Sequence, residues 1–219
     1  GYAPVTVNSM IAALNGLFRF LGWDHCRIRF LKLQRRLFRE DKKELNRREY
    51  QNLVKTAMRK GKKGLALLLE TICATGIRVS EVRYITVETA KKRKAEISLK
   101  GKIRCIFIPG KLAKKLLKYA EREKICRGEI FVTKGGKSLS RRRIWGEMKK
   151  LAKEAGVEES KVFPHNLRHL FARTFYRMDH DLVRLADVLG HSSIETTRLY
   201  LVTTGTEHER QISRMGLVT

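Results

Sequence analysis

The segment from residue 95 to residue 109 constrains the fold of this chain most strongly, because it has the pattern of a β-hairpin. Two alternating or apolar runs meet at Lys100 and Gly101, where a tight turn is expected. Elsewhere the apolar residues recur mainly at helical intervals, and only residues 130–132 suggest another short strand. The sequence therefore predicts a mostly α fold with a small antiparallel β-sheet, of the α+β class.

Helix boundaries are predicted by capping residues. Asn46 and Glu49 have the form of a capping box that opens a helix. Gly76 is expected to end an apolar helix, and Ser80 to cap a short helix after Arg78. The longer helices are expected at residues 6–21, 46–59, 65–74, 111–124, 140–154, 164–178, 181–189 and 194–201.

The charge balance is strongly basic. The 219 residues include 48 Lys and Arg against 22 Asp and Glu, a formal net charge of +26. Nucleic acid is the simplest partner for such a field, and a solvated cationic surface or a surface for anionic membranes is the alternative. No segment supports a membrane span, because the longest apolar stretch, residues 64–72, is too short and carries Glu70.

The cysteines and histidines do not form a metal-binding pattern. The four cysteines, at positions 26, 73, 105 and 126, are widely separated and include no Cys-x-x-Cys pair. They are typical of reduced thiols in a cytoplasmic protein. Neither ligand type has the spacing of a zinc site, so we expect no metal and no other cofactor.

A group of residues between positions 165 and 200 has the chemistry needed at a phosphodiester. It comprises His165, Arg168, His191 and Tyr200. An arginine can hold two phosphate oxygens, an imidazole can move a proton, and a phenol can form a covalent ester. His165 and Arg168 stand three apart, so they would share one helix face after Pro164. The group predicts a site that attacks a DNA phosphate.

The stretch ATGIRVSEV around Arg78 resembles the first signature box of the tyrosine recombinases, the phage integrase family, and the residues after position 165 resemble the second. The resemblance covers residues 47 to about 204. It implies that Arg78 and Arg168 are the two catalytic arginines. It also implies that His165 and His191 are the box II histidines and that Tyr200 is the nucleophile.

The family also has a lysine in a β-hairpin, which acts as the general acid. Lys100 matches this position best, and Lys102 is the alternative because it lies only two residues away. Lys102 is also a candidate DNA contact. The basic run of Arg141, Arg142 and Arg143 is either a solvated face or a set of DNA contacts, and in the family that region faces the major groove.

Two neighbours of the expected site residues have ordinary roles in this interpretation. Glu81 follows Arg78 by three positions and is expected to orient it rather than to react. His169 lies one step along the helix from Arg168 and is expected to be a buried structural residue.

The resemblance divides the chain into three parts. Residues 1–43 would be the C-terminal helix of a truncated core-binding domain with a basic linker, and a genuinely short enzyme is the alternative. Residues 44–204 would be the catalytic domain. Residues 205–219 would be a C-terminal tail that docks on a neighbouring protomer or folds back on its own domain.

The resemblance implies a site-specific DNA recombinase or integrase, of a phage or mobile element. Such an enzyme cleaves and rejoins DNA through a 3′-phosphotyrosyl intermediate and a Holliday junction. The alternatives are an enzyme like the type IB topoisomerases, which religates the same strand, and a catalytically silent DNA-binding regulator.

The expected partner is double-stranded DNA. A homotetramer would bind two duplexes during synapsis, and the free protein could be a monomer. Accessory DNA-bending or directionality factors would fit the family. We expect no membrane association and a cytoplasmic location at the nucleoid of a bacterial or phage-infected cell.

Overall fold

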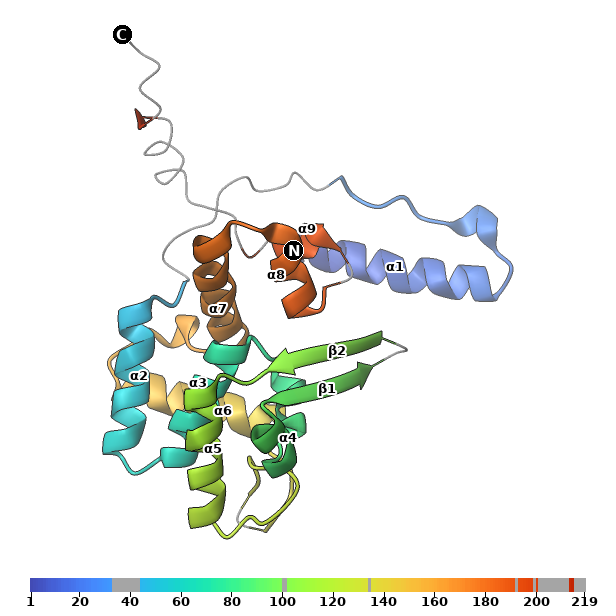
Figure 1. The fold of residues 1–219 in the computed structure, drawn as a ribbon. Helices are drawn as coiled ribbons and strands as arrows, with labels where there is room; N and C mark the ends of the chain where they lie inside the picture. The colour runs from blue at the N-terminus through green and yellow to red at the C-terminus, as the bar shows by residue number, and fades with distance from the viewer. Residues whose placement is uncertain are drawn as a thin grey trace. The chain divides into compact units, whose positions relative to one another are not determined.

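The computed structural model describes residues 1–32, 44–99, 102–133, 135–191, 193–198, 200 and 213–214 (Figure 1). The chain divides into two compact units, Gly1–Arg39 and Glu40–Thr219. The predicted tail at residues 205–219 lies outside the described residues except for Ser213 and Arg214.

The smaller unit contains one long helix and a chain segment that returns along it. Helix α1 spans Pro4–Phe20 and begins with a proline at its first turn, and the short helix η1 spans Asp24–Cys26. Two asparagines of α1 then bind the returning backbone through paired side-chain hydrogen bonds. Asn8 pairs with Leu31 at 2.8 and 2.9 Å, and Asn15 pairs with Ile28 at 2.9 Å in both directions.

The larger unit is mostly helical. Its longer helices are α2 (Arg47–Arg59), α3 (Lys63–Thr75), α5 (Gly110–Arg122), α6 (Arg141–Glu154), α7 (Pro164–Asp179) and α8 (Leu182–Leu189). Its short helices are η3 (Val79–Tyr84), α4 (Val87–Lys92), η4 (Glu159–Lys161) and α9 (Ile194–Arg198). Helix α4, which the sequence analysis did not predict, is opened by Thr86, whose side chain accepts from the Thr89 N–H.

The capping predictions have different outcomes. Asn46 and Glu49 form the predicted capping box at α2, with both hydrogen bonds at 2.8 Å. Ser80 is not the cap of η3: that helix begins after Arg78, whose backbone N–H donates to the Glu81 carboxylate at 3.0 Å. Glu81 takes this place because it stands three residues on, within reach of the free N–H at a helix start.

The predicted hairpin is present. Strand β1 (Lys94–Leu99) pairs antiparallel with β2 (Lys102–Phe107), and Ile97 lies opposite Arg104. Figure 1 shows the hairpin between α4, which contacts β1, and α8, which contacts β2. The strand expected at residues 130–132 does not form; this segment has isolated bridges only at Glu129 and Val132. It bonds to a loop instead, with the Ile130 N–H donating to the Ile85 carbonyl at 3.1 Å. A mostly α fold with a small antiparallel sheet is thus confirmed.

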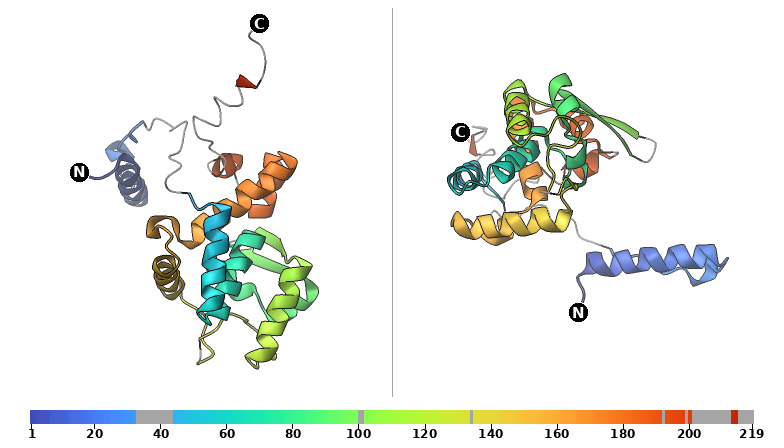
Figure 2. Two further views of the ribbon diagram at one scale, coloured as in Figure 1. Left: turned by 90° about the vertical axis from the view of Figure 1, so that its left-hand side faces the viewer. Right: turned by 90° about the horizontal axis from the view of Figure 1, so that it is seen from below.

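The core of the larger unit is built around α3. Its buried residues include Leu67, Leu68, Leu69 and Ile72, and it contacts α2, α5 and α7. Helix α6 packs against α2 on one side of the unit (Figure 2). Each fully buried leucine of this kind contributes roughly 1.5–3 kcal/mol relative to an exposed one. This packing fixes the C-terminal end of α3, from which the first signature box begins.

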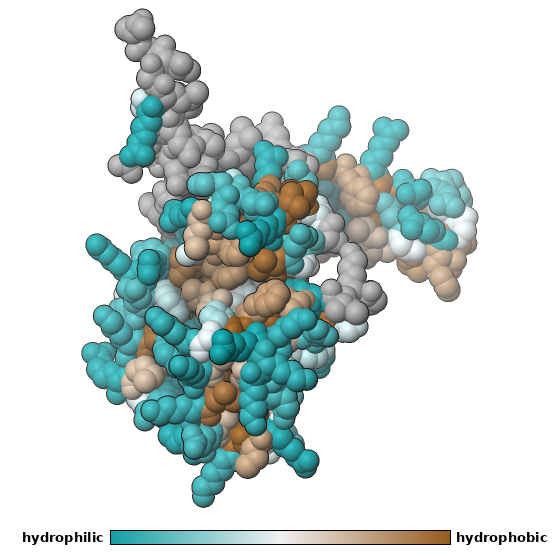
Figure 3. All heavy atoms as spheres, viewed as in Figure 1, coloured by the Kyte–Doolittle hydropathy of each residue, from teal (hydrophilic) through white to brown (hydrophobic). Residues whose placement is uncertain are grey.

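Hydrophilic side chains cover much of the face seen in Figure 3. Among the described residues, no helix is both long and apolar enough to cross a membrane.

Candidate active site

The C-terminal end of α8 brings three arginines together. Gly190 ends the helix with a φ of 64°, and the His191 N–H closes it by donating to the Ala186 carbonyl at 3.0 Å. The last carbonyls then accept from arginines of other elements: Val188 from Arg104 Nε at 3.2 Å, Leu189 from Arg168 Nη2 at 2.7 Å, and Gly190 from Arg78 Nη2 at 3.1 Å. Carbonyls at a helix C-terminus carry partial negative charge, so they stabilise these cations.

Arg168 lies at the centre of the site. Its side chain is 1% exposed, and its guanidinium also donates to the Gly76 carbonyl at the end of α3. It thus bridges the ends of two helices. Burial is the main cause that lowers the pKa of Arg168, and the nearby Arg78 lowers it further, whereas the contact with the Tyr200 hydroxyl raises it. The structure therefore gives this arginine one orientation.

Arg78 is the more accessible of the two predicted catalytic arginines. Gly76, in the left-handed conformation, turns the chain out of α3 and places Arg78 at the start of η3. Arg78 Nη1 donates to Glu81 Oε1 at 2.9 Å, and its side chain is 39% exposed. Glu81 is almost fully buried, at 1% exposure, so its carboxylate is held in place. It orients the Arg78 guanidinium through this hydrogen bond, as the sequence predicted.

Tyr200 lies among three histidines. It follows α9 in a turn, with its N–H donating to the Thr197 carbonyl at 2.9 Å, rather than lying inside the predicted helix. Its ring centroid is 4.1 Å from that of His169, in a stacked arrangement, 5.3 Å from that of His165 and 5.2 Å from that of His191. The tyrosine is 6% exposed. The fold thus gathers the predicted nucleophile and both box II histidines at one place.

The hydrogen bonds of His191 define its tautomer. Arg168 Nη2 can only donate, so His191 Nε2, 3.0 Å away, must accept. The ring N–H is therefore on Nδ1, which lies 2.8 Å from the Thr197 hydroxyl oxygen. Burial, followed by the charges of Arg168 and Arg78, lowers the pKa of His191 to about 4. The imidazole is neutral near pH 7.

The two hairpin lysines do not have described side chains. Lys100 lies outside the described residues, and Lys102 is described only as the first residue of β2. The hairpin itself is held beside the site, because Arg104 of β2 reaches both Glu81 and the end of α8.

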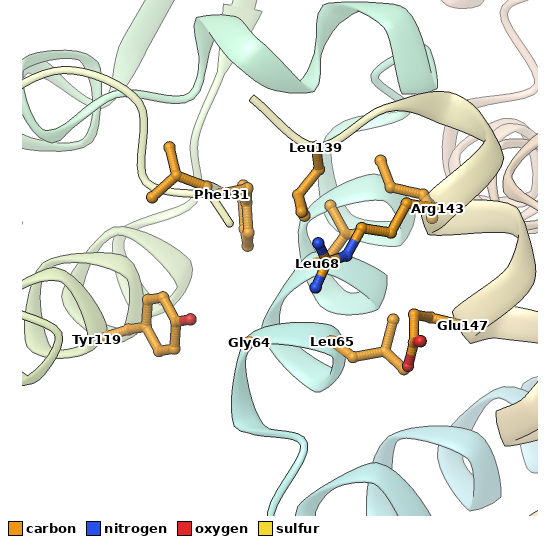
Figure 4. A pocket seen from close by; sticks show the side chains of 10 residues that line it. Gly64, Leu65, Leu68, Tyr119, Phe131, Leu139, Arg143 and Glu147 are labelled. Carbon is orange, nitrogen blue, oxygen red and sulfur yellow. The ribbon is translucent and has the colours of Figure 1, made fainter. Parts of the chain in front are cut away.

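The basic run at the start of α6 is divided between two hollows. Arg141 and Arg142 line one of about 400 Å³, together with Trp145 and His165. Arg143 lines another, of about 180 Å³, whose other walls include Tyr119 and Phe131; Figure 4 shows it there with Glu147. Residues 141 and 142 therefore lie next to a site histidine, whereas Arg143 lies on a different side of the helix.

Sequence reasoning missed the roles of two residues. His169 was expected to be buried, which it is, but it also stacks on Tyr200; its spacing of four residues from His165 was the available signal. Arg104 was not singled out at all. The signal there was an arginine within the apolar run of residues 103–108.

Within the described ranges, no group of three or more histidine, cysteine or acidic side chains is arranged to hold a metal ion. The polar groups gathered here are cations and imidazoles, which suit an anionic substrate group.

The fold is that of the tyrosine recombinases. The model of the phage integrase family matches residues 43–206, and the chain belongs to that family. Tyrosine recombinase XerA of Pyrococcus furiosus is 29% identical over 227 residues, which cover 100% of this chain and 77% of that protein. Tyrosine recombinase XerD of Listeria monocytogenes is 30% identical over 215 residues, 91% of this chain and 72% of that protein.

Solved structures agree in fold. The crystal structure of XerA recombinase has a TM-score of 0.67 at 20% identity, covering 100% of this chain and 78% of that chain. The post-cleavage complex of XerH recombinase with palindromic difH substrate has a TM-score of 0.74 at 22% identity, covering 97% of this chain and 65% of that chain. A λ integrase dimer bound to a COC′ core site has a TM-score of 0.67 at 17% identity, covering 90% and 73%.

Proposed function

We propose that this tyrosine recombinase cleaves and rejoins duplex DNA at specific sites through a 3′-phosphotyrosyl intermediate. The observation that carries the proposal is the gathering of Tyr200, Arg168 and His191 from separate elements around one point. The names of the similar structures add support, since several are recombinases solved with DNA.

In the proposed step, the Tyr200 oxygen attacks the scissile phosphorus and the bond to the 5′ oxygen breaks. The number of phosphate ester bonds is conserved, because no water enters. Arg78 and Arg168 stabilise the negative charge that develops on the non-bridging oxygens. His165 accepts the phenol proton, and neutral His191 supplies hydrogen bonds. The 5′ oxygen takes its proton from Lys100 or, as the alternative, from Lys102.

The buried position of Tyr200 adds a step before attack. At 6% exposure, and stacked on His169, the phenol is not open to a phosphate. Arg78, at 39% exposure, is open to one. We therefore propose that DNA first binds at Arg78, and that Tyr200 then leaves its stack on His169 to reach the phosphate.

The start of α6 is the proposed DNA-contacting surface beside this site. Arg141, Arg142 and the half-exposed Trp145 surround the hollow that His165 also lines. Lys149 lies 5.1 Å from the centroid of the Trp145 ring and adds another cation. Cations and an open aromatic ring suit phosphates and base edges.

The oligomeric state of the protein on DNA and its biological source are proposed from the family resemblance. A homotetramer on two duplexes would exchange strands through a Holliday junction, and a phage or other mobile element is the proposed source. Crosslinking of the DNA complex would test the tetramer. Direct repeats flanking the gene would support the source.

Covalent trapping tests the proposed function. The chain is incubated with nicked, randomised duplexes, and a denaturant-resistant protein–DNA adduct is sought. We expect an adduct from the unaltered chain and none from Tyr200→Phe, with duplex affinity unchanged. Tyr84→Phe is the matched control, because it removes a phenol hydroxyl that accepts from exposed Arg83, just after the first signature box and away from the proposed nucleophile.

The outcomes distinguish the alternatives. An adduct that persists in Tyr200→Phe contradicts the assignment of the nucleophile. Tight binding without any adduct favours the silent regulator. Adducts that religate only their own strand, with no exchange between duplexes, favour an enzyme like the type IB topoisomerases.

A further inference from the structure

We propose that Arg104 is a positioning residue for the reaction, which ties the β-hairpin to the Arg78–Glu81 pair and to the end of α8. This inference rests on the proposed function. With its side chain 9% exposed, Arg104 acts through the groups that it binds rather than on the phosphate itself.

The contacts of Arg104 join segments that are distant in sequence. Its side chain leaves β2 opposite Ile97 and is 9% exposed. Nη1 donates to Glu81 Oε2 at 3.0 Å, and Nε donates to the Val188 carbonyl at 3.2 Å. One side chain therefore connects the hairpin, the first signature box and α8.

The Glu81 carboxylate is shared between two arginines. Its Oε1 accepts from Arg78 Nη1, and its Oε2 accepts from both the Arg78 N–H and Arg104. A carboxylate at 1% exposure is stable in ionised form only if it is paired and hydrogen-bonded. Arg104 supplies half of that pairing, so its loss would release the group that orients Arg78.

Arg104 remains a cation under physiological conditions. Burial is the main cause that lowers its pKa, to about 10, and Arg168 and Arg78 lower it further, while Glu81 opposes the change. Three cations in this space repel one another, and the Glu81 carboxylate offsets the repulsion. The bond from Arg104 to its second oxygen holds this carboxylate in the orientation in which it also binds Arg78.

The bond to Val188 acts on the other side of the site. The Gly190 carbonyl, two residues on, accepts from Arg78, and His191 follows directly. A helix end opens easily when its carbonyls lose their partners. Arg104 therefore holds the segment that carries both an acceptor for Arg78 and the neutral histidine.

The experiment compares Arg104→Gln and Arg104→Lys with Lys94→Gln, which removes an exposed cation from the other hairpin strand. We expect Arg104→Gln to slow adduct formation at saturating DNA on the order of 100-fold, as for misplaced reacting groups. DNA affinity should stay the same. Arg104→Lys keeps the charge but cannot make both hydrogen bonds, so it should recover only part of the rate. Lys94→Gln should match the unaltered chain.

Two further measurements separate positioning from general damage. In a double-mutant cycle with Glu81→Gln, the rate losses should be non-additive, because both side chains act on Arg78. Without DNA, the amides of Arg78, Gly190 and His191 should exchange hydrogen faster in Arg104→Gln than in Lys94→Gln. A Lys variant with the unaltered rate, additive losses, or unchanged exchange would overturn the proposal.

The proposal can still be tested if a variant does not fold or if no adduct forms. If Arg104→Gln does not fold, Arg104→Lys carries both the rate and the exchange measurements. If the unaltered chain forms no adduct, the proposed function has failed, and hydrogen exchange alone then decides whether Arg104 holds the site together.

Discussion

At the scale of single residues, Gly190 is required for two separate reasons. Its φ of 64° lies in the left-handed region, which costs other residues roughly 1–2 kcal/mol. A Cβ at this position would also stand 2.3 Å from Arg104 Cδ, so the arginine would have to move. Any side chain here disturbs both the helix end and the residue that we propose ties it to the hairpin.

Gly190→Ala should therefore destabilise the protein more than Gly61→Ala. Gly61 has a similar φ of 71°, but a Cβ there would meet no atom within 4 Å. We expect about 1 kcal/mol for Gly61→Ala and a further 1–3 kcal/mol for Gly190→Ala, from the displaced side chain. Denaturant unfolding measures both. Equal losses would show that Arg104 is not packed against Gly190.

At the scale of elements, α6 presents its basic residues in different directions. A helix turns by about 100° per residue, so three consecutive arginines cannot share a face. Arg141 and Arg142 lie beside His165, whereas Arg143 lies in the hollow between α6, α3 and α5. This division decides which of them can reach DNA bound at the site.

Alanine substitutions on α6 should separate these arginines. Arg141→Ala and Arg142→Ala should each weaken duplex binding and make the log-log dependence of affinity on salt less steep by about 0.9, the value for one phosphate contact. Arg143→Ala should leave the slope unchanged. The measurement is a DNA titration at several salt concentrations. An equal change for all three would mean that α6 approaches DNA from another side.

At the scale of the whole molecule, burial of His191 makes stability depend on pH. Its pKa of about 4 lies below the 6.5 of an unburied histidine, so the unfolded chain binds more protons between these values. The contribution is complete above pH 6.5 and is lost as the pH falls toward 4. It should be smaller than the ~3 kcal/mol of a fully desolvated ring, because solvent screens the part of the ring that is exposed.

His191→Asn should remove this contribution. Its free energy of unfolding should fall less than that of the unaltered chain between pH 6.5 and pH 4, and the measurement is urea unfolding at each pH. His25→Asn, at an exposed position in the smaller unit, is the control and should follow the unaltered chain. A parallel fall in all three proteins would show that His191 is not held neutral.

Sequence could predict what depends on residue type and local spacing. Local patterns predicted the hairpin, the α2 capping box and the grouping of His165 with Arg168, because each of these follows from neighbouring residues. The sequence also named Tyr200, through the family resemblance. The acid lysine, Lys100 or Lys102, stays a prediction, since neither side chain is described.

What sequence could not predict depends on contacts between distant segments. Arg104 meets Glu81 across 23 positions and Val188 across 84. No local pattern encodes such a meeting. The same holds for Arg143, whose separation from its two neighbours depends on where α3 and α5 pack.

The arginines of the site bind backbone carbonyls at the end of α8, so these contacts do not depend on the side chains of that segment. Backbone oxygens are present whatever side chain stands at positions 188 and 189, so substitution scans there would leave the acceptors of Arg104 and Arg168 intact. Related chains could differ at these positions and still hold their arginines alike. Replacing the Leu189–Gly190 peptide bond by an ester would weaken the Leu189 acceptor, and thereby probe directly what substitution cannot reach.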